Sequence, residues 1–261
     1  MASMTVTSSD GTTLAARVSG DGPPIVLVHG GNGDLDTFRL IEPLLAERHT
    51  VWVYSRRGRG GSGDAPDYSF RREIEDVLAV VAAAGDEVHL LGHSGGAAYA
   101  LAAAASLPSL RSLILYEPPL RLDGIDLDVL EAVEAAVAAG EPGRALDTAF
   151  PSEGITDDEG RLLRSMEPVW ARLCEGVRLV PREIRAGLAE GDRLQALRPP
   201  GVATLYLRGE HTDAPVFATP AEVEERFPKA EQRVLAGQRH LAFAFAPDAF
   251  ARAVLDFTTA T

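Results

Sequence analysis

The chain has 261 residues, which fits one large domain with an insertion, and its hydrophobic fraction of 46% is enough to bury a sizeable core. Its 25 basic and 38 acidic residues give a net charge of −13, which disfavours nucleic acid and anionic membrane surfaces as partners. The single cysteine, Cys174, excludes an internal disulfide. Because no secretion signal begins the sequence and no apolar run reaches the roughly 20 residues of a membrane span, we expect a cytoplasmic protein.

Strand and helix patterns alternate along most of the chain, as in a parallel sheet with helices on both faces. Two opening strands, at 4–8 and 12–18, form a predicted hairpin because the intervening Asp10-Gly11 is a turn signal. Six more strands are predicted at 25–29, 50–54, 87–91, 111–116, 202–207 and 231–235. Predicted helices lie at 35–47, 69–84, directly after Ser94, 219–227 and 247–258. The fold class is therefore α/β, with a mostly parallel eight-stranded sheet.

The alternation stops between about Leu120 and Arg198. Residues 127–137 show the helical spacing of apolar side chains, and no convincing strand interrupts the stretch around them. The regular pattern resumes after Pro199-Pro200-Gly201. We therefore predict a core made of residues 1–119 and 199–261, with a helical insertion at 120–198.

The most specific motif is the segment Gly92-His93-Ser94-Gly95-Gly96, which joins an apolar strand to an alanine-rich helix. This is the nucleophile-elbow pattern G-x-S-x-G in its expected setting. A chain that reverses from strand to helix within a few residues leaves no room for side chains, so Gly92 and Gly96 supply the missing volume. Ser94 is thereby held at the tip, where the backbone N–H of Gly95 can bind a developing oxyanion.

With three further landmarks, the chain resembles the α/β-hydrolase superfamily, in its branch with a serine nucleophile and a helical cap. Residues 25–33 form an apolar strand that ends in a His-Gly-Gly turn, similar to the family's oxyanion loop, which implies Gly31 as a second backbone donor. Residues 50–62 resemble the next strand and its Arg-Gly-x-Gly-x-Ser loop, although Ser55 stands where relatives usually carry Asp. Residues 237–240 place His240 where the family has its catalytic histidine.

A serine hydroxyl is a weak nucleophile and needs an imidazole to take its proton and return it to the leaving group. The resemblance assigns this role to His240 and the nucleophile's role to Ser94. Four other histidines are interpreted as structural and not as catalytic bases. His29 and His93 are interpreted as hydrogen-bonding or pocket-wall residues, and His49 and His89 as peripheral ones.

The carboxylate that orients the histidine has three candidates. The usual family site is the turn after the penultimate strand, but Thr212 stands at the expected position and Asp213 is one residue late, so Asp213 would need a one-residue bulge. Some relatives take the acid from the end of the strand after the nucleophile helix, where Glu117 stands before two prolines. Glu210 is the third candidate. Of these, Asp213 is the first choice and Glu117 the alternative acid.

The predicted substrate pocket draws on the helical insertion, where an apolar stripe includes Met166 and Trp170, and on Phe243, just past His240. These side chains could line the pocket, or they could simply pack the insertion against the sheet. Three arginines of the 50–62 loop could grip an anionic substrate, but surface ion pairs are the preferred interpretation: Arg56, Arg57 and Arg59. Cys174 is interpreted as an apolar filler.

The sequence thus predicts a serine hydrolase that cleaves a small or medium ester or related acyl substrate through an acyl-enzyme on Ser94. No metal cluster or cofactor fingerprint is found in it, so neither a cofactor nor a metal is expected. Carbon–carbon bond hydrolysis or lyase chemistry on the same residues remains an alternative, because fold alone does not choose the reaction. A second alternative is a hydrolase-fold protein that binds a small molecule without turning it over, which the irregular turn at 209–213 keeps open.

Overall fold

The computed structural model describes residues 2–261 and is built on one eight-stranded sheet with the strand order β1-β2-β4-β3-β5-β6-β7-β8. In this order β1 and β2 each run antiparallel to the next strand, and the other six strands, β3 included, are parallel to one another. The predicted fold class is confirmed. The strand bounds are β1 Ala2–Thr7, β2 Thr13–Ser19, β3 Pro24–Val28, β4 Thr50–Tyr54, β5 His89–His93, β6 Ser112–Tyr116, β7 Ala203–Gly209 and β8 Glu231–Leu235.

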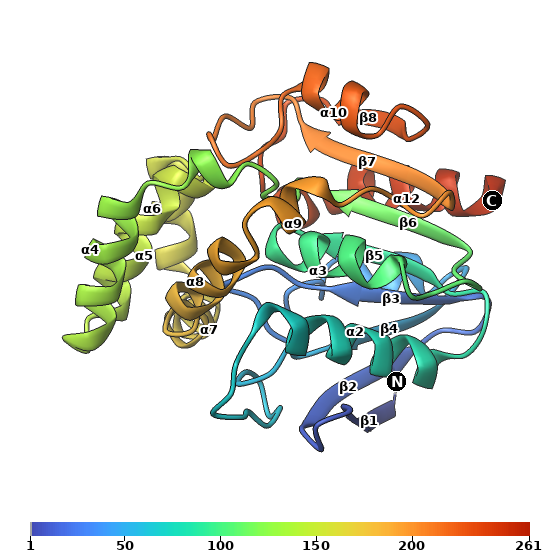
Figure 1. Cartoon of the computed structure of the whole chain (residues 1–261), viewed down its shortest axis with the longest axis horizontal. Helices are drawn as coiled ribbons and strands as arrows, with labels where there is room; N and C mark the ends of the chain where they lie inside the picture. The colour runs from blue at the N-terminus through green and yellow to red at the C-terminus, as the bar shows by residue number, and fades with distance from the viewer. Residues whose placement is uncertain (1) are drawn as a thin grey trace.

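Helices cover both faces of the sheet, because the central strands are apolar on both sides and must be buried on both. One face packs against α2 (Phe70–Ala84), α3 (Gly95–Ala104) and α10 (Pro220–Arg226). The other packs against α1 (Glu42–Leu45), α11 (Ala242–Phe245) and α12 (Pro247–Ala260). Figure 1 shows α2 and α3 in front of the strands and α12 behind them.

Between β6 and β7 the chain forms a series of helices joined by turns, with no strand. We call residues 120–198 the helical segment. It has its own apolar cluster, separate from the two clusters on the sheet. Figure 1 shows α4 to α8 gathered beyond the arrowheads of the strands, at the carboxyl edge of the sheet. The elements are η1 Leu122–Gly124, α4 Leu127–Ala138, α5 Pro142–Ala149, η2 Phe150–Glu153, α6 Asp157–Ser165, α7 Glu167–Val177, α8 Val180–Glu190 and α9 Asp192–Ala196.

The predicted helix at 35–47 is wrong over most of its length, since only α1, at Glu42–Leu45, is an α-helix there. The residues before it form turns instead. The Asp34 carboxylate accepts a hydrogen bond from the amide of Asp36, and the Thr37 hydroxyl accepts one from the amide of Asp34. Such local side-chain bonds compete with helical ones, which explains why the apolar spacing misled the prediction. Among the helices of residues 2–261, none is long and apolar enough to cross a membrane.

Candidate active site

Ser94 lies at a sharp turn between β5 and α3, in a backbone conformation that non-glycine residues rarely adopt (φ 53°, ψ −128°). The turn is possible only with glycines beside it. A Cβ at Gly92 would lie 2.5 Å from the Cα of Ala97, and a Cβ at Gly96 would lie 2.4 Å from the carbonyl oxygens of Val28 and His29. This strained backbone presents the Ser94 hydroxyl to the space in front of the strand ends.

Two backbone amides near Ser94 are available to a ligand oxygen. Gly95 is the first residue of α3, so its N–H lies at the positive end of that helix. Gly31 belongs to the loop after β3, residues 29–33, which we call the oxyanion loop. Within residues 2–261, neither amide donates to another backbone group, and both glycines line the same cavity as Ser94.

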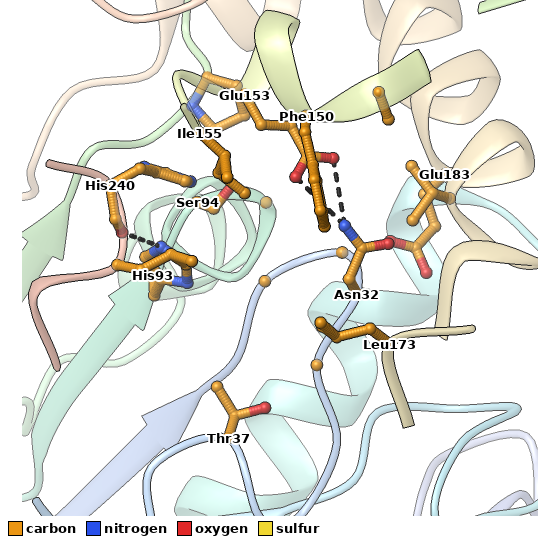
Figure 2. A pocket seen from close by; sticks show the side chains of 18 of the residues that line it. Asn32, Thr37, His93, Ser94, Phe150, Glu153, Ile155, Leu173, Glu183 and His240 are labelled. Carbon is orange, nitrogen blue, oxygen red and sulfur yellow. Dashed lines mark hydrogen bonds between the residues drawn. The ribbon is translucent and has the colours of Figure 1, made fainter. Parts of the chain in front are cut away.

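His240 lies in the loop between β8 and α11, and its partner is the carboxylate of Glu117. The Nδ1 of His240 and the Oε2 of Glu117 are 2.6 Å apart, and both side chains are almost fully buried. The other oxygen of Glu117 accepts a hydrogen bond from the amide of Gly209 at 2.7 Å. Glu117 thus has both oxygens engaged, and the ring of His240 points towards Ser94 (Figure 2).

The structure does not bring Asp213 to His240, contrary to the first expectation. The β7 turn closes early, because the amide of Thr212 donates to the carbonyl of Gly209, and Asp213 follows this turn with an exposed side chain. Glu210 is also exposed and accepts a hydrogen bond from the amide of Gly237. No bulge places Asp213 against the histidine, and Glu117 occupies the position next to Nδ1.

Aromatic and imidazole rings fix the remaining sides of His240. His93 stacks on it with ring centroids 4.5 Å apart, and the Nε2 of His93 lies 3.0 Å from the carbonyl oxygen of His240. The hydroxyl of Tyr116 donates to the carbonyl of Arg239 and accepts from the amide of Ala242. Burial and the neighbouring His240 hold the pKa of His93 well below its usual value, so His93 is neutral and structural, as the sequence predicted.

The side chains of Arg56 and His29 orient the peptide that carries the Gly31 amide. The carbonyl oxygen of Gly30 accepts from Nη1 of Arg56 at 3.1 Å and lies 2.8 Å from Nδ1 of His29. The Nε2 of His29 accepts from the Arg56 amide, so Nδ1 carries the proton. Since the Gly30 oxygen and the Gly31 N–H lie on opposite sides of one planar trans peptide, fixing the oxygen also fixes the direction of the N–H.

The three arginines of the β4 loop do not lie on the surface, contrary to the preferred interpretation. Arg56 and Arg57 are fully buried, and each makes two hydrogen bonds to a carboxylate of α2, Glu73 for Arg56 and Asp76 for Arg57. Arg56 and Arg59 also pair with Glu183 of α8, which connects the helical segment to the oxyanion loop. They are internal ion pairs, and so they are not free to hold an anionic substrate.

A cavity of about 440 Å³ lies between the carboxyl edge of the sheet and the helical segment. Ser94, His240 and both glycines with available amides line it. Met166 and Phe243 line it as predicted, but Trp170 does not. Trp170 packs inside the helical segment against Phe150 and below the guanidinium of Arg164, because it lies on the side of α7 that faces α5. The rest of the wall is mainly aliphatic, with Ile125, Val129, Leu130, Ile155, Leu163, Val169, Leu173, Val180 and Ile184.

One polar pair in this wall was not predicted from the sequence. Asn32 of the oxyanion loop donates from Nδ2 to both carboxylate oxygens of Glu153, which lies at the end of η2, at 3.2 Å each (Figure 2). Burial raises the pKa of Glu153, against the opposing effects of His240 and of the Asn32 hydrogen bond. The two residues are 121 positions apart, and only the position of Asn32 within the His-Gly-Gly-Asn turn could have drawn attention to it.

Comparisons with known proteins agree with this geometry. The sequence profile described as "Alpha/beta hydrolase family" matches residues 25–253, so the chain belongs to the alpha/beta hydrolase family. An alpha/beta hydrolase of known structure from Sphaerobacter thermophilus is 33% identical, with a TM-score of 0.78 over 97% of this chain and 99% of that one.

Two curated relatives are similar over shorter stretches. The N-formylmaleamate deformylase of Pseudomonas putida is 37% identical over 108 residues, and the match covers 40% of each chain. The pimeloyl-[acyl-carrier protein] methyl ester esterase of Xylella fastidiosa is 34% identical over 99 residues, or 38% of each chain. This chain thus matches well under half of the length of either relative.

Proposed function

We propose that this protein is a serine hydrolase that cleaves an ester or related acyl compound through an acyl-enzyme on Ser94. The observation that carries the proposal is that Ser94 and His240 line one cavity while Nδ1 of His240 lies 2.6 Å from the Glu117 carboxylate. A serine and an imidazole in one cavity, with a carboxylate bound to the imidazole, are the groups that acyl transfer needs. Glu117, rather than Asp213, is the proposed acid.

In the proposed reaction, His240 takes the proton of Ser94 as the serine oxygen attacks the carbonyl carbon of the substrate. The carbonyl oxygen becomes an oxyanion and accepts hydrogen bonds from the amides of Gly31 and Gly95. When the tetrahedral intermediate collapses, the bond to the alcohol breaks and His240 donates its proton to the leaving oxygen. Water then attacks the acyl-enzyme by the same steps and releases the acid and free Ser94.

The acid group has two tasks in this scheme. Glu117 holds the Nδ1 proton of His240, so that Nε2 faces the serine, and it stabilises the imidazolium that forms after proton transfer. The amide of Gly209 holds the other oxygen of Glu117, which keeps the carboxylate from rotating away. These contacts support turnover over ligand binding alone, because the binding-only alternative was based on the irregular turn around Asp213.

We further propose that the helical segment, residues 120–198, acts as a cap over the site and that the substrate is a small molecule. The aliphatic wall of the cavity supports an apolar acyl or alcohol group. An ester is the proposed substrate class, and the names of the two curated relatives, a deformylase and a methyl ester esterase, both describe hydrolysis of an acyl compound. Serine at the elbow argues against chemistry that requires a carboxylate nucleophile there.

The test is covalent labelling with a fluorophosphonate, followed by intact mass measurement, together with hydrolysis of p-nitrophenyl hexanoate. We expect one adduct and measurable hydrolysis for the wild type, and neither for Ser94→Ala. A folded wild-type protein that forms no adduct and hydrolyses no ester would overturn the proposal. An adduct that persists in Ser94→Ala would mean that a different residue is the nucleophile.

A further inference from the structure

The cavity wall contains five carboxylates, which are Asp34, Asp36, Asp126, Glu153 and Glu183. All of them except Glu153 have an ion-pair partner or an exposed position that explains them. Asp34 pairs with Arg172, Asp36 with Arg17, and Glu183 with Arg56 and Arg59. Asp126 is exposed and caps the first turn of α4.

Glu153 is the exception. Within residues 2–261 no arginine or lysine pairs with it, its hydrogen bonds come from the neutral amide of Asn32, and the group that can carry a positive charge and acts on it is His240 of the site itself. Glu153 is partly buried, and partial burial of a carboxylate without a cation is unfavourable, so it attracts a cation or a strong hydrogen-bond donor. The cavity is the space from which such a group could come.

Asn32 supplies a second, independent indication. Its Nδ2 must face Glu153, because the amide oxygen in that place would face two carboxylate oxygens. The Oδ1 of Asn32 is then buried on the other side of the amide, and within the described chain it has no hydrogen-bond partner. The acceptors that remain for a ligand in the cavity are the two carboxylate oxygens of Glu153, and the neutral amide of Asn32 does not balance their charge.

We infer that Asn32 and Glu153 form a subsite for an ammonium group of the substrate, so that the preferred ester carries a primary amine and an ester that carries a carboxylate is rejected. An ammonium group is a positively charged hydrogen-bond donor, which matches the two carboxylate oxygens and the negative charge of Glu153. This inference rests on the proposed function, since it places the subsite in the same cavity as Ser94.

Other charges around the cavity are consistent with a preference for cations. The buried arginines of the β4 loop are paired with Glu73, Asp76 and Glu183, so they do not compete for a substrate carboxylate. Arg172 is paired with Asp34, and Arg39 is exposed on the rim. The net charge of −13 adds a long-range attraction for cationic substrates.

The test compares p-nitrophenyl esters of matched length that differ in terminal charge: hexanoate, 6-aminohexanoate and adipate monoester. We expect the wild-type kcat/KM to be highest for 6-aminohexanoate and lowest for adipate, with a span of about tenfold to a hundredfold, as for one buried hydrogen bond to a charged group. Glu153→Gln should lower the aminohexanoate value by about tenfold or more relative to the hexanoate value of the same variant, and should raise the adipate value relative to it. Asp126→Asn is the matched control, because it removes one negative charge from the rim and should keep the wild-type order.

Binding to Ser94→Ala separates this inference from the chemistry. Calorimetric titration with hexylamine at pH 7 should give a Kd about tenfold lower than in the Ser94→Ala/Glu153→Gln double variant. If hexylamine binds both variants equally, or if Glu153→Gln lowers kcat/KM for all three esters by the same factor, the subsite is not an ammonium site. If no ester is hydrolysed but hexylamine binding depends on Glu153, the proposed function fails and the subsite stands.

Discussion

The carboxyl ends of β6 and β7 are neighbours in the sheet and both end in a short turn with a carboxylate, but only the first contacts His240. Tyr116 and Leu207 pair in register, so β6 ends at that level, whereas β7 continues to Gly209 before its turn starts. Glu117 adopts a positive φ of 47° and its carboxylate reaches His240. Asp213 comes later in its turn and faces solvent.

The comparison teaches that the direction of a side chain and its place along the turn together decide which carboxylate reaches the histidine. The positive φ of Glu117 is an unfavourable conformation for a residue with a side chain, costing of order 1–3 kcal/mol. Two hydrogen bonds to its carboxylate hold it there. The β7 turn contributes through its backbone instead, since the amide of Gly209 binds Glu117 and the amide of His211 binds the carbonyl of Gln238.

The largest expected effect is a change in kcat when the carboxylates of Glu117 and Asp213 are neutralised one at a time. Glu117→Gln keeps the shape but reverses one hydrogen bond and removes the charge, so we expect kcat for p-nitrophenyl hexanoate to fall about a thousandfold or more. Asp213→Asn should change kcat by less than about twofold. Steady-state kinetics on both variants, with circular dichroism to verify folding, decides between the turns. A large loss in Asp213→Asn with a small one in Glu117→Gln would reverse the assignment.

A carboxylate moved to the β7 turn should recover part of that loss. A Cβ at Gly209 would lie 2.7 Å from the hydroxyl of Thr212, so Thr212 borders the amide that binds Glu117. We expect Glu117→Gln/Thr212→Asp to be about tenfold more active than Glu117→Gln alone, since one charge returns near His240. The control is Glu117→Gln/Thr212→Asn, which has the same shape without the charge. Equal rates for the two double variants would show that the β7 turn cannot reach the histidine.

A smaller effect is expected from the residues through which each turn holds the His240 loop. Tyr116→Phe leaves the carbonyl of Arg239 and the amide of Ala242 without their partner, so we expect a loss of about 1–3 kcal/mol in the free energy of unfolding. We also expect kcat to fall several-fold. Glu210→Gln changes one exposed hydrogen bond and should lower stability by only about 0.5 kcal/mol. Urea unfolding measures both, and equal losses would contradict this ranking.

The smallest effect on activity is expected from the amino ends of β5 and β6, where Nδ1 of His89 is 2.7 Å from the hydroxyl of Ser112. Burial, with smaller contributions from His49 and Arg111, lowers the pKa of His89 to about 4. In the unfolded chain the pKa of histidine is about 6.5, so between these values only the unfolded state binds the proton. The contribution of neutral His89 to stability is therefore present above about pH 6.5 and is lost as the pH falls towards 4.

Urea unfolding at pH 7.5 and pH 5 measures this dependence, with His89→Gln as the comparison. The variant should lose less stability between the two pH values than the wild type does. A wild type and a variant with the same difference would show that His89 is not the group responsible. Glu117→Gln and Asp213→Asn lie at the opposite end of the strands, so the ranking of their activities should be the same at both pH values.

Short-range patterns were sufficient to predict the elbow, most of the strands and the loop that carries His240, because each depends on residues that are close in sequence. The acid was harder, since the choice between Glu117 and Asp213 depends on one backbone angle. Glu153 was out of reach, because its partner Asn32 is far away in the chain. The helix predicted at 35–47 was wrong because side-chain bonds of Asp34 and Thr37 favour turns there.

The ion pairs between Glu183 and the arginines of the β4 loop restrict how the protein can change during evolution or in the laboratory. Arg56 and Arg59 are buried in the core, but one of their counter-charges lies on the helical segment. A segment transplanted from another hydrolase without a carboxylate at this position would leave buried guanidinium groups undercompensated, which destabilises a protein by about 3–5 kcal/mol. New specificities are therefore more accessible by substitutions within the segment than by exchange of the whole segment.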